Sequence, residues 1–166
     1  MLTIRPATET DHGIIWKIFH EVIATGDTYA FDPKISRDDA LAYWFRADTH
    51  TYVAEKDREI VGTYTLRPNQ AGGGAHVANA AFLVAANARG QGIGRAMGEH
   101  SLSEARGFGF RAMQFNFVVS TNESAVRLWQ ELGFKIVGTL PAAFRHPTKG
   151  YVDVYVMFRS LMEPRL

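Results

Sequence analysis

A glycine-rich segment, Arg89-Gly90-Gln91-Gly92-Ile93-Gly94-Arg95, constrains this chain more than any other stretch. The residues before it, 76–84, are mostly apolar, which predicts a buried strand. Behind it, small and apolar residues recur at helical spacing as far as Ala105, which predicts a helix. The first N–H groups of a helix lack internal acceptors and carry the positive end of its dipole. The segment therefore predicts a backbone cradle for a phosphate group, and a tight turn without a ligand would have the same pattern.

The register of the glycines excludes two common nucleotide-binding loops. A P-loop requires Lys followed by Ser or Thr after its last glycine, and here Arg95 follows Gly94. The dinucleotide fingerprint requires a third glycine, which would fall at Arg95 if the motif began at Gly90 and at Met97 if it began at Gly92. The phosphate that the segment predicts therefore belongs to another class of ligand.

Composition limits the classes of protein that remain. The 166 residues fit a single domain, and 46% hydrophobic and 21% charged residues are typical of a globular protein. A net charge of +1 predicts no nucleic-acid or membrane partner. The absence of cysteine excludes disulfides and a Cys nucleophile, and the histidines lack metal-ligand spacing, so we expect no metal. No signal peptide or transmembrane run is evident, and we expect a cytoplasmic location.

The order of the predicted elements indicates a mixed α/β (α+β) fold. Alternating or apolar runs predict strands at 2–5, 51–56, 59–66, 76–84, 113–119, 134–138 and 151–157. Amphipathic spacing predicts helices that include residues 14–23, 41–45, 92–106 and 125–132. Thr8 with Asp11, and Ser36 with Asp39, fit helix-capping boxes, and a long connection is expected from 141 to 150. We expect one domain, 1–166, with a largely antiparallel central sheet, helices on both faces and a β-α-β unit near its middle.

Two segments resemble the sequence pattern of the GCN5-related N-acetyltransferases. Val84 followed by Arg89-x-x-Gly92-x-Gly94 is similar to the family's pyrophosphate loop. Asn122-x-x-Ala125-x-x-Leu128-Trp129-x-x-x-Gly133-Phe134 is similar to its second segment, in which Tyr usually stands at the position of Trp129. The segments occur in the family's order, and the resemblance covers nearly the whole chain. Residues 27–33 and 144–155 resemble the phosphinothricin and amino-acid N-acetyltransferase branch.

The resemblance implies that the chain transfers an acetyl group from acetyl-CoA, its cosubstrate, to a primary amine of a small molecule. Main-chain groups at the end of the strand 76–84 would pair with the pantetheine arm, and N–H groups of the glycine-rich segment would hold the pyrophosphate. The resemblance also implies a homodimer. The residues implied for cofactor binding are Phe82, Leu83, Val84, Arg89, Gly90, Gln91, Gly92, Ile93, Gly94, Arg95, Asn122 and Trp129.

The sequence does not identify the catalytic groups. Trp129 stands where the family usually has a proton-donating Tyr, and an indole N–H is far too weak an acid for that role. We expect Trp129 to pack against the end of the pantetheine arm. Tyr151 and Tyr155 are candidate acids, and His76 and Asp32 are candidate bases. With no Cys and no evident Ser–His pair, we expect direct attack in a ternary complex.

The resemblance to the amino-acid branch implies an amino acid or analogue as the acceptor. The residues expected to bind it are Thr28, Tyr29, Phe31 and Arg145. A carboxylate on the acceptor is expected to pair with Arg67, Arg145 or Lys149. A polyamine, an aminoglycoside or a protein N-terminus remains an alternative acceptor. A non-catalytic CoA-binding sensor also remains open, because Trp129 replaces the usual acid.

Overall fold

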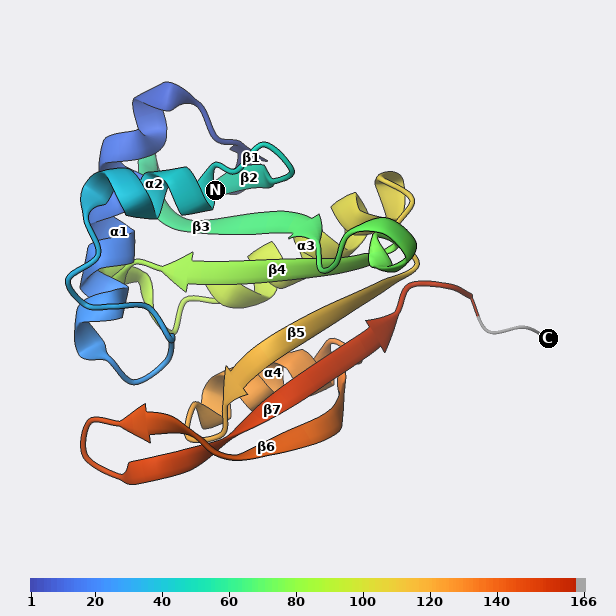
Figure 1. Ribbon diagram of the computed structural model, residues 1–166. Coiled ribbons are helices and arrows are strands. Elements are labelled where there is room, and N and C mark those ends of the chain that lie inside the picture. Colours follow the sequence, from blue (N-terminus) through green and yellow to red (C-terminus); the bar gives the residue numbers. More distant parts are fainter. Residues whose placement is uncertain (164–166) are drawn as a thin grey trace.

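Seven strands form one sheet in the order β1-β2-β3-β4-β5-β7-β6 (Figure 1). The computed structural model describes residues 1–163. The strands are β1 (Leu2–Pro6), β2 (His50–Lys56), β3 (Glu59–Pro68), β4 (Val77–Val84), β5 (Ala112–Val119), β6 (Lys135–His146) and β7 (Gly150–Ser160). Neighbouring strands are antiparallel except β4 and β5, which run parallel. The expected mixed, largely antiparallel sheet is confirmed.

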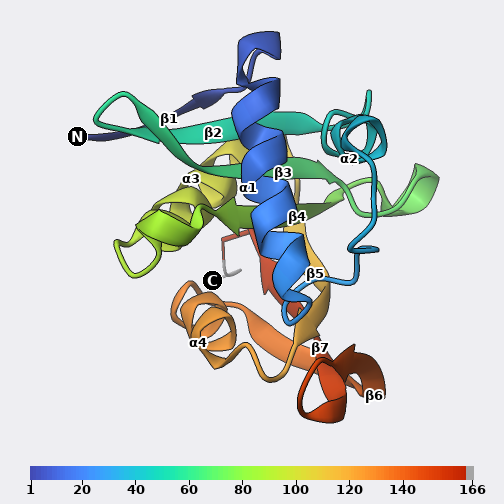
Figure 2. The ribbon, with the colours of Figure 1, turned by 90° about the vertical axis from the view of Figure 1, so that its left-hand side faces the viewer.

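Within residues 1–163, four α-helices cover the sheet from both sides. They are α1 (His12–Thr25), α2 (Arg37–Trp44), α3 (Ile93–Gly107) and α4 (Glu123–Glu131). Figure 2 shows α3 and α4 on one side of the sheet and α2 on the other, with α1 crossing in front of the strand ends. Short 3₁₀ turns lie at Glu9–Asp11, Gly72–Gly74 and Ala86–Ala88. The helix α3 connects the parallel strands β4 and β5, so the expected β-α-β unit is present.

Side-chain caps start the first two helical segments at the positions that the sequence predicts. The Thr8 N–H donates to Asp11 Oδ2 (2.8 Å), and the Asp39 N–H donates to Ser36 Oγ (3.1 Å). The first cap precedes a 3₁₀ turn that runs directly into α1. Asp11 also accepts hydrogen bonds from Arg5 of β1 at 2.8 and 3.0 Å. The cap therefore ties the start of α1 to the edge of the sheet as well as satisfying a free N–H group.

The last hairpin is longer than the sequence pattern predicts. The expected connection over 141–150 is mostly strand, because β6 runs on to His146. Pro141 cannot donate to the strand ladder, the register with β7 shifts after Leu140, and Ala142 has a φ of 49°. A bulge around the proline lets β6 continue beyond it, and a pattern of apolar and polar residues does not reveal such a bulge.

The sheet opens between β4 and β5. Only Val77 and Ala78 of β4 are in register with β5, where they lie opposite Ala112 and Met113. Figure 1 shows the two strands moving apart toward their C-terminal ends. From that point β4 is paired on one side only, with β3. The opening, called here the β4–β5 gap, is where a ligand can reach unpaired main chain in the middle of the sheet.

Candidate functional site

The edge of β4 that faces the gap carries main-chain groups that β3 does not use. The N–H of Ala85 donates to the carbonyl of Val61 in the β3 direction (2.8 Å), whereas the N–H and C=O of Phe82 bond on the opposite side. Because the main-chain groups of a strand alternate in direction, Val84 faces the gap as Phe82 does, and Leu83 faces β3. Of the three residues expected to pair with a pantetheine arm, Phe82 and Val84 therefore have the suitable orientation.

The hydroxyl of Tyr29 is bonded to both free main-chain groups of Phe82. It accepts a hydrogen bond from the Phe82 N–H (3.1 Å) and donates one to the Phe82 carbonyl (2.5 Å). Burial raises the pKa of Tyr29 to about 12, so its phenol stays neutral at pH 7 and cannot act as a general base there. A ligand chain that pairs with Phe82 must displace this hydroxyl.

The glycine-rich segment forms the turn between β4 and α3. Gly90 and Gly92 have φ values of 75° and 78°, in the left-handed region that glycine adopts at least cost. A Cβ atom at either position would meet no atom within 4 Å, so the turn faces open space. The first helical bond runs from the Ala96 N–H to the Gly92 carbonyl (3.1 Å), and N–H groups of 93–95 lack a helical acceptor. This geometry fits a phosphate group at the N-terminus of α3.

The charged side chains of this turn have partners of their own. Arg95 forms an ion pair with Glu131 of α4, which joins the start of α3 to the end of α4. The Oε1 atom of Gln91 accepts a hydrogen bond from Lys56 (2.8 Å). Arg89 is exposed. Glu131 offsets the positive charge of Arg95, so the main chain supplies most of the capacity of the turn to bind an anion.

An aromatic cluster closes the gap on the side of α3 and α4. The Trp129 ring lies 4.8 Å, between ring centres, from both Phe82 of β4 and Phe115 of β5. Trp129 is 8% exposed and so bridges the two strands where they separate. A Cβ atom on Gly98 of α3 would lie 3.1 Å from the Trp129 ring, so a glycine there lets α3 and α4 approach closely.

Two polar side chains at the N-terminus of α4 are available to a ligand. Asn122 occupies the N-cap position of α4, but its side chain does not cap the helix. Its Oδ1 atom accepts a 3.3 Å hydrogen bond from Ser124 instead. The Oγ1 atom of Thr121 is buried and has no hydrogen-bond partner within residues 1–163. Sequence reasoning missed Thr121, because a polar residue before a helix is too common to single it out.

Polar side chains of β3 project to the opposite face of the sheet. The Tyr64 hydroxyl hydrogen-bonds His100 of α3 (2.6 Å), so the alternate residues Thr65 and Arg67 point to the side of α2. Arg67 is only 4% exposed, and its guanidinium carbon lies 4.5 Å from the ring centre of Tyr43 in α2. Within residues 1–163, Arg67 Nε and Nη2 and Thr65 Oγ1 are buried without hydrogen-bond partners. Burial lowers the pKa of Arg67, yet a guanidinium stays charged at neutral pH.

A row of aromatic side chains runs from the gap to Arg67. The ring centres of Tyr29 and Phe31 are 6.3 Å apart, and those of Phe31 and Tyr43 are 5.1 Å apart. Tyr43 in turn contacts Arg67. Thr28, next to Tyr29, is partly buried. The loop between α1 and α2 thus brings three of the residues expected to bind the acceptor to the α2 side of the gap.

The two candidate bases are both exposed side chains. His76 is exposed just before β4, six residues before Phe82, roughly 20 Å along an extended strand. Asp32 lies in the loop between α1 and α2, where its carboxylate is exposed and accepts from the Lys34 N–H (2.8 Å). His76 is therefore not held beside Phe82, and the Asp32 carboxylate is open to solvent.

The two candidate acids differ in their placement. Tyr151 is 70% exposed in the hairpin of β6 and β7, opposite Arg145, which is also exposed. Tyr155 is partly buried against the main core. Phe115, which contacts Trp129, is in register with Met157, and Tyr155 lies two residues from Met157 on the same face of β7. Tyr155 is thus the candidate acid that shares a face with Trp129.

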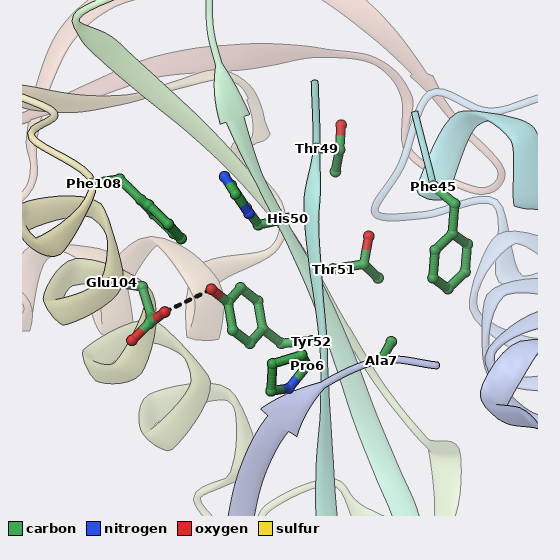
Figure 3. A pocket seen from close by; sticks show the side chains of 9 residues that line it. All are labelled: Pro6, Ala7, Phe45, Thr49, His50, Thr51, Tyr52, Glu104 and Phe108. Atoms are coloured by element: carbon green, nitrogen blue, oxygen red, sulfur yellow. Dashed lines mark hydrogen bonds between the residues drawn. The ribbon is translucent and has the colours of Figure 1, made fainter. Parts of the chain in front are cut away.

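A separate cavity of about 450 Å³ lies beside the edge of the sheet, between β2 and the end of α3 (Figure 3). In it the Tyr52 hydroxyl donates to the Glu104 carboxylate (2.6 Å), and the His50 ring stacks on Phe108 with ring centres 3.9 Å apart. The hydroxyl of Thr51 donates to a main-chain carbonyl (2.8 Å). The hydroxyls of Tyr52 and Thr51 are thus hydrogen-bonded within the protein, and in the sheet β3 lies between β2 and β4.

Residues 1–163 contain no group of three or more His, Cys, Asp or Glu side chains arranged to hold a metal ion. None of the helices in that part of the chain is long and apolar enough to cross a membrane.

Comparisons with known proteins bear on the origin of this arrangement. A model of the acetyltransferase (GNAT) family matches residues 14–134, well over half of the chain. N-acetyltransferase aca1 of Schizosaccharomyces pombe is 31% identical over 151 residues, which cover 81% of this chain and 72% of aca1. A solved GCN5-related N-acetyltransferase from Kribbella flavida is 45% identical with a TM-score of 0.93, covering 96% of this chain and 97% of that one. A phosphinothricin acetyltransferase from Sinorhizobium meliloti, solved with AcCoA, is 21% identical and shares the fold at a TM-score of 0.86, covering 99% and 93%. The chain belongs to the acetyltransferase (GNAT) family.

Proposed function

We propose that this protein transfers the acetyl group of acetyl-CoA to the primary amine of a small molecule, an amino acid or an analogue, by direct attack in a ternary complex. The observation that carries the proposal is the β4–β5 gap, which separates an anion-binding turn on the side of α3 from an aromatic and polar surface on the side of α2. The two substrates approach from opposite faces of the sheet and meet at the open edge of β4.

Three observations support acetyl-CoA as the cosubstrate. The left-handed turn at Gly90 and Gly92 leaves room and free N–H groups for its pyrophosphate. Phe82 and Val84 offer main-chain partners to the amides of the pantetheine arm. Beside Asn122, Thr121 supplies a buried hydroxyl that has no hydrogen-bond partner in the described part of the chain, residues 1–163. When bound, acetyl-CoA supplies an acetyl thioester that is activated toward attack by a neutral amine.

The described side chains limit how protons move at this site. The amine must lose its proton before it attacks, and Tyr29 cannot accept that proton at neutral pH because its pKa is about 12. Trp129 cannot protonate the departing thiolate, because indole is not an acid in this range. Of the two candidate acids, Tyr155 shares a face of the sheet with Trp129, and we propose that Tyr155 protonates the departing thiolate. The N–H groups of Phe82 and Val84 are the donors suited to a developing oxyanion.

A panel of amines tests the acceptor class. We expect free amino acids and methionine sulfoximine-like compounds to be acetylated with a higher kcat/KM than spermidine or aminoglycosides, measured by release of free CoA thiol. The opposite ranking would move the acceptor to the polyamine or aminoglycoside class, and acetylation of peptide N-termini alone would move it to proteins. Binding of acetyl-CoA without thiol release on any amine would identify a sensor. Intersecting double-reciprocal lines are expected for direct transfer, whereas parallel lines indicate an acyl-enzyme.

Gly92→Ala tests the cradle. A side chain in the left-handed region costs about 1–2 kcal/mol, and its Cβ would face the space proposed for the pyrophosphate. Gly72→Ala is the matched control, since Gly72 also has a positive φ (57°) and open space around its Cβ but lies far from this turn. Both variants should lose similar stability, and only Gly92→Ala should bind acetyl-CoA more weakly by calorimetry. Equal affinity in the two folded variants would refute the cradle.

We also propose a homodimer, as the family resemblance implies. The edge strand β6 supports it, because Ile136, Val137 and Leu140 are 38%, 61% and 40% exposed. Sedimentation velocity at micromolar concentration measures the mass, and a monomer there would refute this part of the proposal.

A further inference from the structure

Arg67 is a buried cation that lacks the partner its position requires. Only 4% of the residue is exposed, and the structure places no hydrogen-bond acceptor in residues 1–163 against Nε or Nη2. Burial of a charge without a partner opposes folding, and the contact with the Tyr43 ring offsets only part of that cost. Because buried charges in proteins are normally paired, an anionic group from outside the chain would complete the hydrogen bonding of this guanidinium.

The unpaired atoms of Arg67 form one edge of its guanidinium. Nε and Nη2 each carry an N–H, and a planar guanidinium presents such pairs as a fork that matches the two oxygens of a carboxylate. Thr65 lies two residues away on the same face of β3, and its buried Oγ1 also has no hydrogen-bond partner among residues 1–163. The two residues together offer three donors to one anionic group.

The place of Arg67 in the sheet relates these donors to the gap. Arg67 lies opposite Asn79, and Phe82 lies three residues further along β4, roughly 10 Å in an extended strand. Asn79 is the first residue of β4 beyond the paired stretch, and its Nδ2 atom reaches across to the Gln114 carbonyl of β5 (3.0 Å). The aromatic row Tyr29, Phe31, Tyr43 fills the interval between the two ends. The Arg67 guanidinium thus lies at one end of the proposed acceptor surface, and the main-chain N–H and C=O of Phe82 lie at the other.

We propose that Arg67 and Thr65 bind the carboxylate of the acceptor and so select amino acids against amines that lack a carboxylate. This inference rests on the proposed function and assigns the acceptor specificity of the same site. The guanidinium holds the carboxylate in two parallel hydrogen bonds, and the neutral amine of the same molecule is directed along the aromatic row toward Phe82. Arg145 is exposed in the hairpin of β6 and β7, where water competes for its charge, so it is the lesser partner.

The test compares amino acids with their primary amides, which keep the size and the amine but lose the negative charge. We expect the wild-type protein to favour the acids. Arg67→Met should lower kcat/KM for the acids by about 100-fold, chiefly through KM. For the amides, kcat/KM of this variant should stay within about threefold of the wild-type value, so the preference for acids over amides disappears. Thr65→Val should lower kcat/KM for the acids by a smaller factor, about tenfold.

Two further variants separate carboxylate binding from a general loss of charge or structure. Arg46→Met removes an exposed arginine near the same face, which is paired with Asp48, and should leave the preference intact. Arg67→Met should not melt below the wild-type protein, because it removes an unpaired buried charge. In the wild-type protein alone, amino acids should raise the melting temperature and their amides should not.

The outcomes distinguish this inference from the proposed function. If amino acids are acetylated and Arg67→Met keeps the preference for acids over amides, or Arg145→Met abolishes it instead, the assignment to Arg67 is wrong. If no amino acid is acetylated, the acceptor class is wrong. In that case the melting temperature still tests whether Arg67 binds a carboxylate. Amino acids should raise it in the wild-type protein and should not raise it in Arg67→Met.

Discussion

Tyr29 contributes to both of the proposed substrate surfaces. Its hydroxyl satisfies both main-chain groups of Phe82, which are the groups that an acyl-pantetheine chain would use. Its ring belongs to the aromatic row on the acceptor side. If acetyl-CoA pairs with Phe82 as proposed, its binding breaks these two hydrogen bonds and shifts a residue of the proposed acceptor surface, which would couple the two binding events at Tyr29.

We expect Tyr29→Phe to bind acetyl-CoA about tenfold more tightly, because no hydroxyl competes for Phe82. The free protein should lose about 1 kcal/mol of unfolding free energy, since buried main-chain groups lose their partner. Calorimetry and chemical denaturation measure the two effects. Tyr52→Phe is the control, because it removes a hydroxyl bonded to Glu104 away from the gap, so it should lower stability without changing affinity. Unchanged affinity in Tyr29→Phe would show that cofactor binding does not have to displace this hydroxyl from Phe82.

The contact between α3 and α4 lies on the side of the gap that Trp129 covers. It depends on Gly98, where a Cβ atom would lie 2.7 Å from Leu132 and 3.1 Å from Trp129. The ion pair of Arg95 with Glu131 joins the same two helices at the entrance. Because Trp129 bridges β4 and β5, a shift of α4 changes the region where the thioester would lie.

Two glycines of α3 provide a matched pair of variants for this contact. Gly107→Ala gains helix propensity of up to about 1 kcal/mol, and its Cβ meets no atom within 4 Å. Gly98→Ala gains the same propensity but must displace Leu132 or Trp129, which costs about 1–3 kcal/mol. We therefore expect Gly98→Ala to be the less stable of the two in urea denaturation, and to bind acetyl-CoA more weakly. Equal stabilities of the two variants would mean that α4 shifts to accommodate the added Cβ atom without a measurable cost in free energy.

The molecule as a whole consists of one sheet that is split in its middle, so its two halves must be held by other contacts. On the N-terminal side, Asp11 joins β1 to the start of α1 through Arg5 and is only 5% exposed. The hydrogen bond from Arg5 lowers the pKa of Asp11 below its ordinary value of 3.8, against the opposing effect of burial. The ion pair stabilises the fold fully above about pH 4.

Asp11→Asn should lower the free energy of unfolding at pH 7 by about 2 kcal/mol. A carboxyl whose pKa is lower in the folded state contributes stability that is lost as pH falls through that value. The difference between variant and wild type should therefore shrink below about pH 4. Asp48→Asn, which breaks an exposed pair with Arg46, should change stability by less than about 0.5 kcal/mol. A difference for Asp11→Asn that persists unchanged at pH 2 would contradict this account.

Local sequence signals determined the order of the elements and several of their ends. Ser36 precedes α2 and accepts its capping hydrogen bond, and the hairpin of β2 and β3 turns at Asp57-Arg58, as predicted. The strand-to-helix turn at the glycine-rich segment also follows from neighbouring residues alone. These features depend on backbone preferences and hydrogen bonds within a few residues, which a linear pattern records. The resemblance to the family was likewise identified from two local segments that occur in the family's order.

Only the tertiary structure decided which side chains meet at the gap. Tyr29 contacts Phe82 across 53 positions of sequence, and Arg95 reaches Glu131 across 36. Thr63 and Thr65 lie within the predicted strand 59–66, and Arg67 follows it directly. The sequence did not show that these side chains are buried beneath α2, or that Nε and Nη2 of Arg67 have no hydrogen-bond partner within residues 1–163. Burial and pairing depend on how distant elements pack together, and no run of neighbouring residues encodes which surface will cover them.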